Sequence, residues 1–325
     1  MSSFNAWDGT FEVLPRDLSA YRKGNTGIDY VHRFASGKPG PHVLINSLTH
    51  GNEFCGMVAA CHLLDTGVRP LLGTLTVSFA NVEAYSTFDT SKPFDSRQID
   101  HNLNRIWSSA WLDGLPGQDG TGLIQQDSVE LRRARALRPA VAAADHILDI
   151  HSTSQDVVPF WVYTGFERNA APALAVGVPS VHMVMPGGFA SGTPLMEHGR
   201  HGLRDSNAGA SMVVECGQHF KQTSADLATQ VTLDFLVHFG LLAPRAPNQP
   251  PLPQQRLELL HTHVIQTTDY AHVRPLVGFE TFAKGELIAT DGDLQIFSPC
   301  DNCTILMPAR AAIVGREGMY LTRPI

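Results

Sequence analysis

The sequence lacks the features that direct a chain to a membrane or to nucleic acid. It has no apolar stretch of about eighteen residues or more, the length that a membrane-spanning helix needs. Its start, MSSFNAWDGTFEVLPRD, lacks the basic-then-apolar order of a signal peptide. No lysine- or arginine-rich run occurs, and the formal charge is −7. We therefore expect no nucleic-acid partner, no membrane partner and a cytoplasmic location.

Cysteine is also scarce, which excludes a disulfide framework. The chain has 5 cysteines in 325 residues, an odd number that favours reduced thiols. Cys300 and Cys303 form a CxxC pair, but no second pair stands near it to complete a structural zinc site. Hydrophobic residues make up 43% of the chain, enough for one large core and a smaller domain.

Short runs rich in valine and isoleucine alternate with helical or glycine-containing stretches, which predicts a mixed α/β sheet flanked by helices. The expected strands lie at 42–48, 74–80, 146–151, 157–163, 180–185 and 211–216. The expected helices cover 53–65, 126–144 and 224–240, the last ending at Gly240.

A proline-rich segment divides the chain. LLAPRAPNQPPLPQQ holds five prolines within fifteen residues, too many for a helix or a central strand. We predict a catalytic domain at 1–243, a linker at 244–256, and a small β domain at 257–325 that borders the active-site cleft.

Two histidines and a glutamate predict a metal site. His50 and Glu53 stand in LTHGNEFCG, where a strand turns into a helix that Asn52 is expected to cap. His151 ends the strand HILDI, and Asp149 two residues earlier is placed to orient a histidine through its second ring nitrogen. Two histidines and one carboxylate, with a fourth position open, are a common ligand set for catalytic zinc.

Two further segments carry groups that such a metal would need. Glu215 ends the apolar run in SMVVECGQH, where an unpartnered carboxylate would be costly to bury. Open α/β sheets place ligands at such strand ends, so we expect Glu215 near the metal. The segment SRQIDHNLNRIW adds Arg97, Asn104 and Arg105, and an arginine fork matches a carboxylate with two parallel hydrogen bonds.

The motifs HGNE, DHNLNR, DIHST and VVECG, in this order and spacing, resemble the succinylglutamate desuccinylase and aspartoacylase family. The resemblance implies a zinc-carboxypeptidase-like fold with a smaller C-terminal β domain. It implies that His50, Glu53 and His151 bind one Zn²⁺ per chain and that Glu215 is the general acid and base. It also implies that the enzyme hydrolyses the amide of a small anionic N-acyl amino acid, releasing a carboxylate and a free amino acid.

The same resemblance implies that Arg97 polarises the scissile carbonyl, while Asn104 and Arg105 hold a substrate carboxylate. Family members have a further substrate-binding arginine, for which Arg204 is the nearest candidate and Arg200 a rival. Family members also contribute a tyrosine from the C-terminal domain. Tyr320 lies near the corresponding position but is no convincing match for it.

Three points stay open at this stage. The glycine-rich segment MPGGFASGTPLMEHGRHGLRD is expected to form a mobile loop over the site and not to pack as regular structure. A metallocarboxypeptidase acting on short peptides and a non-catalytic zinc-containing binding protein are alternative functions. The sequence leaves the acyl group, the amino acid and a homo-oligomeric state undecided.

Overall fold

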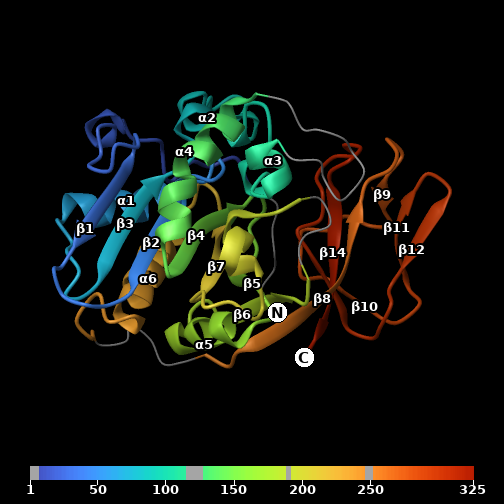
Figure 1. The fold of residues 1–325 in the computed structure, drawn as a ribbon. Helices are drawn as coiled ribbons and strands as arrows, with labels where there is room; N and C mark the ends of the chain where they lie inside the picture. Colours follow the sequence, from blue (N-terminus) through green and yellow to red (C-terminus); the bar gives the residue numbers. More distant parts are fainter. Residues whose placement is uncertain (1–6, 115–126, 188–191, 246–251) are drawn as a thin grey trace.

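A large mixed β-sheet organises the chain, as Figure 1 shows for the computed structural model. The structure describes residues 7–114, 127–187, 192–245 and 252–325. Eleven strands follow one another in the order β1-β3-β2-β4-β7-β5-β6-β8-β14-β13-β10. Their bounds are β1 Val31–Ala35, β2 His42–Ser47, β3 Thr74–Phe79, β4 His146–Thr153, β5 Phe160–Thr164, β6 Val181–Met185, β7 Ser211–Gln218, β8 Gln255–Val264, β10 Thr281–Phe282, β13 Cys303–Leu306 and β14 Glu317–Pro324.

The centre of the sheet is parallel. β3, β2, β4 and β7 pair in parallel in that spatial order, and β5 then pairs antiparallel to β7. The carboxyl ends of β2, β4 and β7 therefore lie together at one edge, where open α/β sheets bind their ligands. All six strands expected from the valine- and isoleucine-rich runs are present, and the predicted mixed α/β sheet is confirmed.

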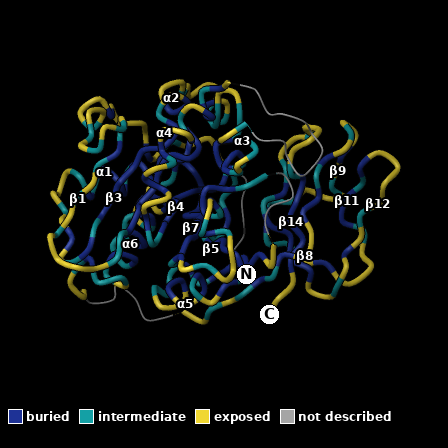
Figure 2. Tube along the Cα trace, viewed as in Figure 1, coloured by how far each residue is buried: buried dark blue, intermediate teal, exposed yellow. Residues whose placement is uncertain are grey.

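Helices cover both faces of the sheet. α1 (Phe54–Asp65), α5 (Glu167–Val176) and α6 (Gln222–His238) pack on one face, and α4 (Val129–Ala143) packs on the other. Side chains of β2 alternate accordingly, and the central strands are buried throughout (Figure 2). Short helical turns complete this region: α2 Val82–Ser86, α3 Ser109–Asp113, and the 3₁₀ turns Ser19–Tyr21, Asp95–Arg97, Leu103–Arg105, Leu195–Glu197 and Gly199–Gly202. No helix within the described ranges is long and apolar enough to cross a membrane.

The helix ends show one prediction confirmed and one wrong. Gly240 adopts a φ of 75° just beyond α6 and donates its N–H to Val237, as expected of a helix stop. Asn52, by contrast, does not cap α1. Its side-chain amide donates to the carbonyl of Pro93 at 3.3 Å, and Glu53 occupies the N-cap position. The cap fails because the Asn52 side chain turns toward the neighbouring loop.

The C-terminal strands continue the same sheet. β8 pairs in parallel with β6, then β14, β13 and β10 follow antiparallel, and a three-stranded sheet of β12 (Leu294–Phe297), β11 (Leu287–Asp291) and β9 (Ala271–His272) packs beside them. Of the expected linker, 246–251 lies outside the described residues, and its last two residues already belong to β8.

Candidate metal centre and active site

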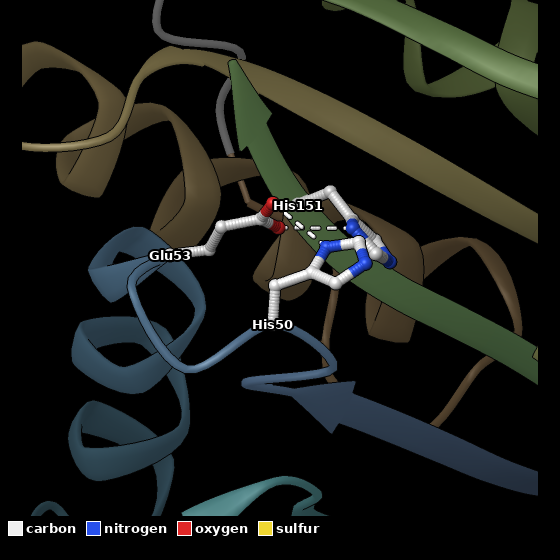
Figure 3. A group of neighbouring side chains, drawn as sticks. All are labelled: His50, Glu53 and His151. Atoms are coloured by element: carbon white, nitrogen blue, oxygen red, sulfur yellow. Dashed lines mark hydrogen bonds and ion pairs between the residues drawn. The ribbon is translucent and has the colours of Figure 1, made fainter. Parts of the chain in front are cut away.

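Three side chains that could hold a metal ion meet at the carboxyl edge of the parallel strands (Figure 3). His50 follows β2, Glu53 precedes α1, and His151 stands on β4. Their ligand atoms lie within 4.8 Å of one another, and all three residues are buried. Nδ1 of His50 is 2.8 Å from Oε1 of Glu53, and Nδ1 of His151 is 2.9 Å from Oε2 of the same carboxylate.

The second nitrogen of each imidazole fixes which atom faces the site. Nε2 of His50 lies 2.9 Å from Oδ1 of Asn102, an oxygen that also accepts a backbone N–H. Nε2 of His151 lies 2.9 Å from Oδ2 of Asp149, as the sequence predicted. Both Nε2 atoms must therefore donate, which leaves both Nδ1 atoms as acceptors facing the Glu53 carboxylate. Such an arrangement can hold a cation between the three side chains, and the donor set suits a divalent ion such as zinc.

Asp149 is itself held rigidly at the base of the site. Its Oδ1 accepts hydrogen bonds from Nδ2 of Asn46 and Oγ1 of Thr49, both at 2.8 Å. Asn46 in turn accepts a hydrogen bond from the hydroxyl of Ser78 on the next strand. This chain of fully satisfied buried groups fixes the orientation of the His151 ring before any ligand binds.

The electrostatics of the site favour positive charge between the three side chains. Burial alone would raise the pKa of Glu53, but His50 and His151 hold it well below its usual value. Burial opposes protonation of His151, yet Asp149 and Glu53 raise its pKa well above the ordinary value. The pKa of His50 falls to about 4 through burial and the nearby Arg97. The carboxylates around His151 therefore favour positive charge at this point of the site.

Arg97 reaches the site from a neighbouring loop. Its Nη1 donates to Oε1 of Glu53 at 3.0 Å. Its side chain is 35% exposed and lines a cavity beside the three candidate ligands. The loop approaches so closely that a Cβ on Gly51 would lie 2.4 Å from the carbonyl oxygen of Ser96 and from the amide of Tyr85. The glycine at position 51 thus lets Arg97 lie beside His50 and Glu53.

Glu215 lies next to His151 because the two strands pair in register. β4 and β7 are parallel, and His151 and Glu215 are direct partners in that ladder. Glu215 is 8% exposed, and its Oε2 is buried with no hydrogen-bond partner among the described residues. Burial raises its pKa to about 8. A carboxyl group of this kind can exchange a proton near neutral pH.

Asn104 and Arg105 line a hollow beside the ligands together with two residues of β14. Oδ1 of Asn104 accepts from the amide of Leu195 at 2.9 Å, which turns its NH₂ group outward as a donor. Arg105 donates through Nε to Oε1 of Glu317 at 2.8 Å and through Nη2 to the Tyr320 hydroxyl at 3.4 Å. No sequence pattern predicted Glu317, because its position depends on how β14 pairs with β8 across two register shifts.

Glu130 is a second residue that sequence reasoning missed. It lies in the first turn of α4, is fully buried, and accepts from the backbone amides of Ile99, Asp100 and His101 at 2.7–3.0 Å. The amide of Asn81 donates a fourth hydrogen bond at 3.1 Å. This carboxylate thus fixes the loop between α2 and α4 that carries the arginines of the site. The sequence shows an acidic residue early in a predicted helix, but it does not show which backbone amides that residue binds.

The structure does not bring Arg204 to the site. Its guanidinium stacks on the ring of Phe166 at 4.8 Å, and it lines neither hollow beside the ligands. The rival Arg200 binds Asp145, before the start of β4 and thus at the opposite end of the strand from His151. The expectation that this segment does not pack as regular structure is wrong for residues 192–205, which form two 3₁₀ turns with Leu195, Met196 and His201 buried. Residues 188–191 of the expected loop lie outside the described residues.

Comparison with known proteins gives the site its context. Residues 39–176 match the model of the succinylglutamate desuccinylase/aspartoacylase catalytic domain. An N-acyl-aromatic-L-amino acid amidohydrolase (carboxylate-forming) of Homo sapiens is 29% identical over 126 residues, which are 37% of this chain and 36% of that protein. The chain thus matches little more than a third of that relative's length.

Solved structures of this family share the fold. A succinylglutamate desuccinylase of Vibrio parahaemolyticus is 16% identical with a TM-score of 0.66, over 91% of this chain and 86% of that one. The product-bound ectoine utilization protein EutE (DoeB) of Ruegeria pomeroyi is 16% identical with a TM-score of 0.60, over 91% and 88%. These likenesses confirm the expected fold. The segment that carries His50, Glu53, Arg97 and His151 is thus similar to the catalytic domain of the succinylglutamate desuccinylase/aspartoacylase family.

Proposed function

We propose that this protein is a zinc-dependent amidohydrolase that cleaves the amide of a small N-acyl amino acid. The observation that carries the proposal is the pair of Nδ1 lone pairs facing one buried carboxylate, with Glu215 beside them. His50, Glu53 and His151 would hold the metal. When bound, a zinc ion supplies Lewis acidity and lowers the pKa of water from near 16 toward about 7.

The protein's own groups would do the remaining chemistry. Glu215 would accept the proton of the attacking water and pass it to the departing amine nitrogen, a transfer typically worth about 10²- to 10⁴-fold. Its burial supports this role, because a carboxyl group with a raised pKa both takes and returns a proton near pH 7. Arg97 would donate to the carbonyl oxygen as negative charge develops there, an effect worth about 10²- to 10³-fold for one donor elsewhere.

A substrate carboxylate would bind in the hollow that Asn104 and Arg105 line. The Asn104 NH₂ group and the planar guanidinium of Arg105 would both donate to that carboxylate. Glu317 and Tyr320 hold the Arg105 side chain in place, so less side-chain freedom is lost when substrate binds. This arrangement supports a substrate that carries a free carboxylate.

The test is hydrolysis by metal-free and zinc-reconstituted protein. A panel of acetyl, succinyl and formyl derivatives of acidic, basic and neutral amino acids is incubated with each form, and the released amine is measured. We expect turnover only with zinc and only when the substrate carboxylate is free, with the corresponding amides inert. Equal turnover by the metal-free protein would contradict the proposal.

The two alternative functions give other outcomes in the same experiment. A metallocarboxypeptidase would cleave short peptides faster than N-acyl amino acids of the same C-terminal residue. A non-catalytic binding protein would take up zinc and cleave nothing. Glu215 weighs against a non-catalytic binding protein, because it lies beside His151 without belonging to the proposed ligand set and has no role in mere zinc retention.

A further inference from the structure

Two hollows adjoin the candidate metal site and differ in chemistry. Both are lined by Arg97, Glu215 and Met307, so they meet where the scissile amide would lie. The first, here called the carboxylate hollow, contains Asn104 and Arg105. The second, here called the acyl hollow, has a volume of about 170 Å³ and room for several water-sized groups. Its other lining residues are Glu53, Ser152, Thr153, Ser154, Gln155, Val157, Phe160, His219, Val277, Gly278, Phe279 and Pro308.

The walls of the acyl hollow are apolar or already hydrogen-bonded. Valine, phenylalanine, methionine and proline side chains from β5 and the C-terminal loops form one wall. On the other wall, the hydroxyl of Ser152 is paired with Nδ1 of His219 at 2.8 Å, and that of Thr153 donates to the carbonyl of Gln155 at 2.8 Å. Burial lowers the pKa of His219 to about 3, so its ring is neutral. Apart from Arg97, Glu53 and Glu215, the described lining of the hollow therefore offers no charge to a ligand.

Arg97 is the one lysine or arginine that lines the acyl hollow among the described residues. Two other cations lie in its neighbourhood but do not line it: Arg310 stacks on Phe94 at 4.1 Å and lines a separate hollow beside Gln155, and Lys221 pairs with Asp156 at 2.6 Å. The four segments outside the described ranges contain no lysine or arginine in their sequence. A second carboxylate in this hollow would thus meet Glu53 and Glu215 but no cation of its own, a costly arrangement.

The covalent order of an N-acyl amino acid decides which part enters which hollow. The carboxylate and the side chain sit on the carbon attached to the amide nitrogen, and the acyl chain sits on the other side of the carbonyl carbon. With the carboxylate at Arg105 and the carbonyl at Arg97, the acyl chain must extend into the acyl hollow. The apolar walls then contact the acyl chain and not the amino acid.

We propose, on the basis of the function proposed above, that this enzyme selects uncharged apolar acyl groups over dicarboxylic ones such as succinyl. The substrate class is an amino acid N-acylated by a monocarboxylic aliphatic or aromatic acid of several carbons. The hydrophobic walls favour burial of such a chain. The lack of a second cation disfavours a terminal carboxylate.

Two acyl groups of matched shape test the inference. The 4-methylpentanoyl and succinyl derivatives of one amino acid have equal numbers of heavy atoms, and only the latter carries a charged end. With zinc-loaded wild-type protein, we expect kcat/KM for the 4-methylpentanoyl substrate to exceed that for the succinyl substrate by at least about 10-fold. A succinyl substrate cleaved equally well or better would overturn the inference while leaving the amidohydrolase function standing. No cleavage of any N-acyl amino acid would overturn both.

A variant that adds a positive charge to the acyl hollow provides a second test. Gln155 lines the hollow with no assigned catalytic role, and Gln155→Arg adds a guanidinium there. We expect the succinyl to 4-methylpentanoyl ratio of kcat/KM to rise at least about 10-fold. Gln295→Arg, at an exposed position on β12, adds the same charge elsewhere and should leave the ratio unchanged. A ratio unchanged in Gln155→Arg, or raised equally in Gln295→Arg, would contradict the placement of the acyl chain.

Discussion

Replacing Glu130 by glutamine should loosen the loop that carries the arginines of the site. The Glu130 carboxylate accepts four hydrogen bonds, two on each oxygen, from Asn81 and three consecutive backbone amides. A glutamine has one accepting oxygen, so either orientation of its amide turns an NH₂ group toward two donors. Each buried donor left unpaired costs about 1–3 kcal/mol, so Glu130→Gln, which leaves two, should lose about 2–6 kcal/mol of unfolding free energy.

The pH dependence of the lost unfolding free energy identifies the Glu130 carboxylate as its cause. Burial opposes ionisation, but the four hydrogen bonds hold the pKa of Glu130 below its ordinary value of 4.5. A depressed pKa means that the ionised group stabilises the fold fully above pH 4.5 and less as pH falls through the folded-state pKa. The difference between wild type and Glu130→Gln should therefore be largest at pH 7 and shrink toward pH 3.

Denaturant unfolding at several pH values measures this effect. Glu83→Gln, the same chemical change at an exposed position of α2, is the matched control and should match wild type at every pH. In zinc-loaded protein, Glu130→Gln should also lower kcat, because Arg97 lies on the loosened loop. An unfolding free energy equal to that of wild type at pH 7 would show that the Glu130 carboxylate does not stabilise this loop.

Four further substitutions test the site itself. Asp149→Asn should weaken zinc binding by about 10- to 100-fold in a chelator competition, and an unchanged affinity would show that this carboxylate does not orient the ligand. Glu215→Gln should retain zinc by elemental analysis yet lose at least about 100-fold in kcat; full turnover would refute its role as proton carrier. Arg105→Lys should raise KM by about 10-fold with a smaller change in kcat, because the fork is lost, whereas an unaltered KM would remove it from substrate binding. Gly51→Ala should destabilise the fold by about 1–3 kcal/mol in thermal unfolding, and a wild-type melting temperature would disprove the close approach of the loop.

Local sequence patterns predicted the ligands and the strands that carry them. His50, Glu53 and His151 each lie where an apolar run ends, and parallel strands bring such ends to one edge of a sheet. The register that places Glu215 beside His151 follows from the same rule. These features need only the hydrophobic pattern and the order of elements.

The parts that the sequence could not predict depend on contacts between distant segments. The position of Glu317 requires the pairing of β14 with β8 and its register shifts, and that of Arg204 requires the path of a glycine-rich segment. β1 and α5 were not expected either, and α5 contains Pro172, a residue that normally opposes a helix. Asn52 failed as a cap because a tertiary contact outcompeted a local one.

Zinc stoichiometry of three purified forms tests the central claim most directly. After zinc loading and removal of free ion, elemental analysis of wild-type protein should find one zinc per chain. The single variants His50→Ala and His151→Ala should hold essentially none while keeping the circular dichroism spectrum of the fold. Wild-type protein that binds no zinc, or variants that retain a full equivalent, would contradict the account.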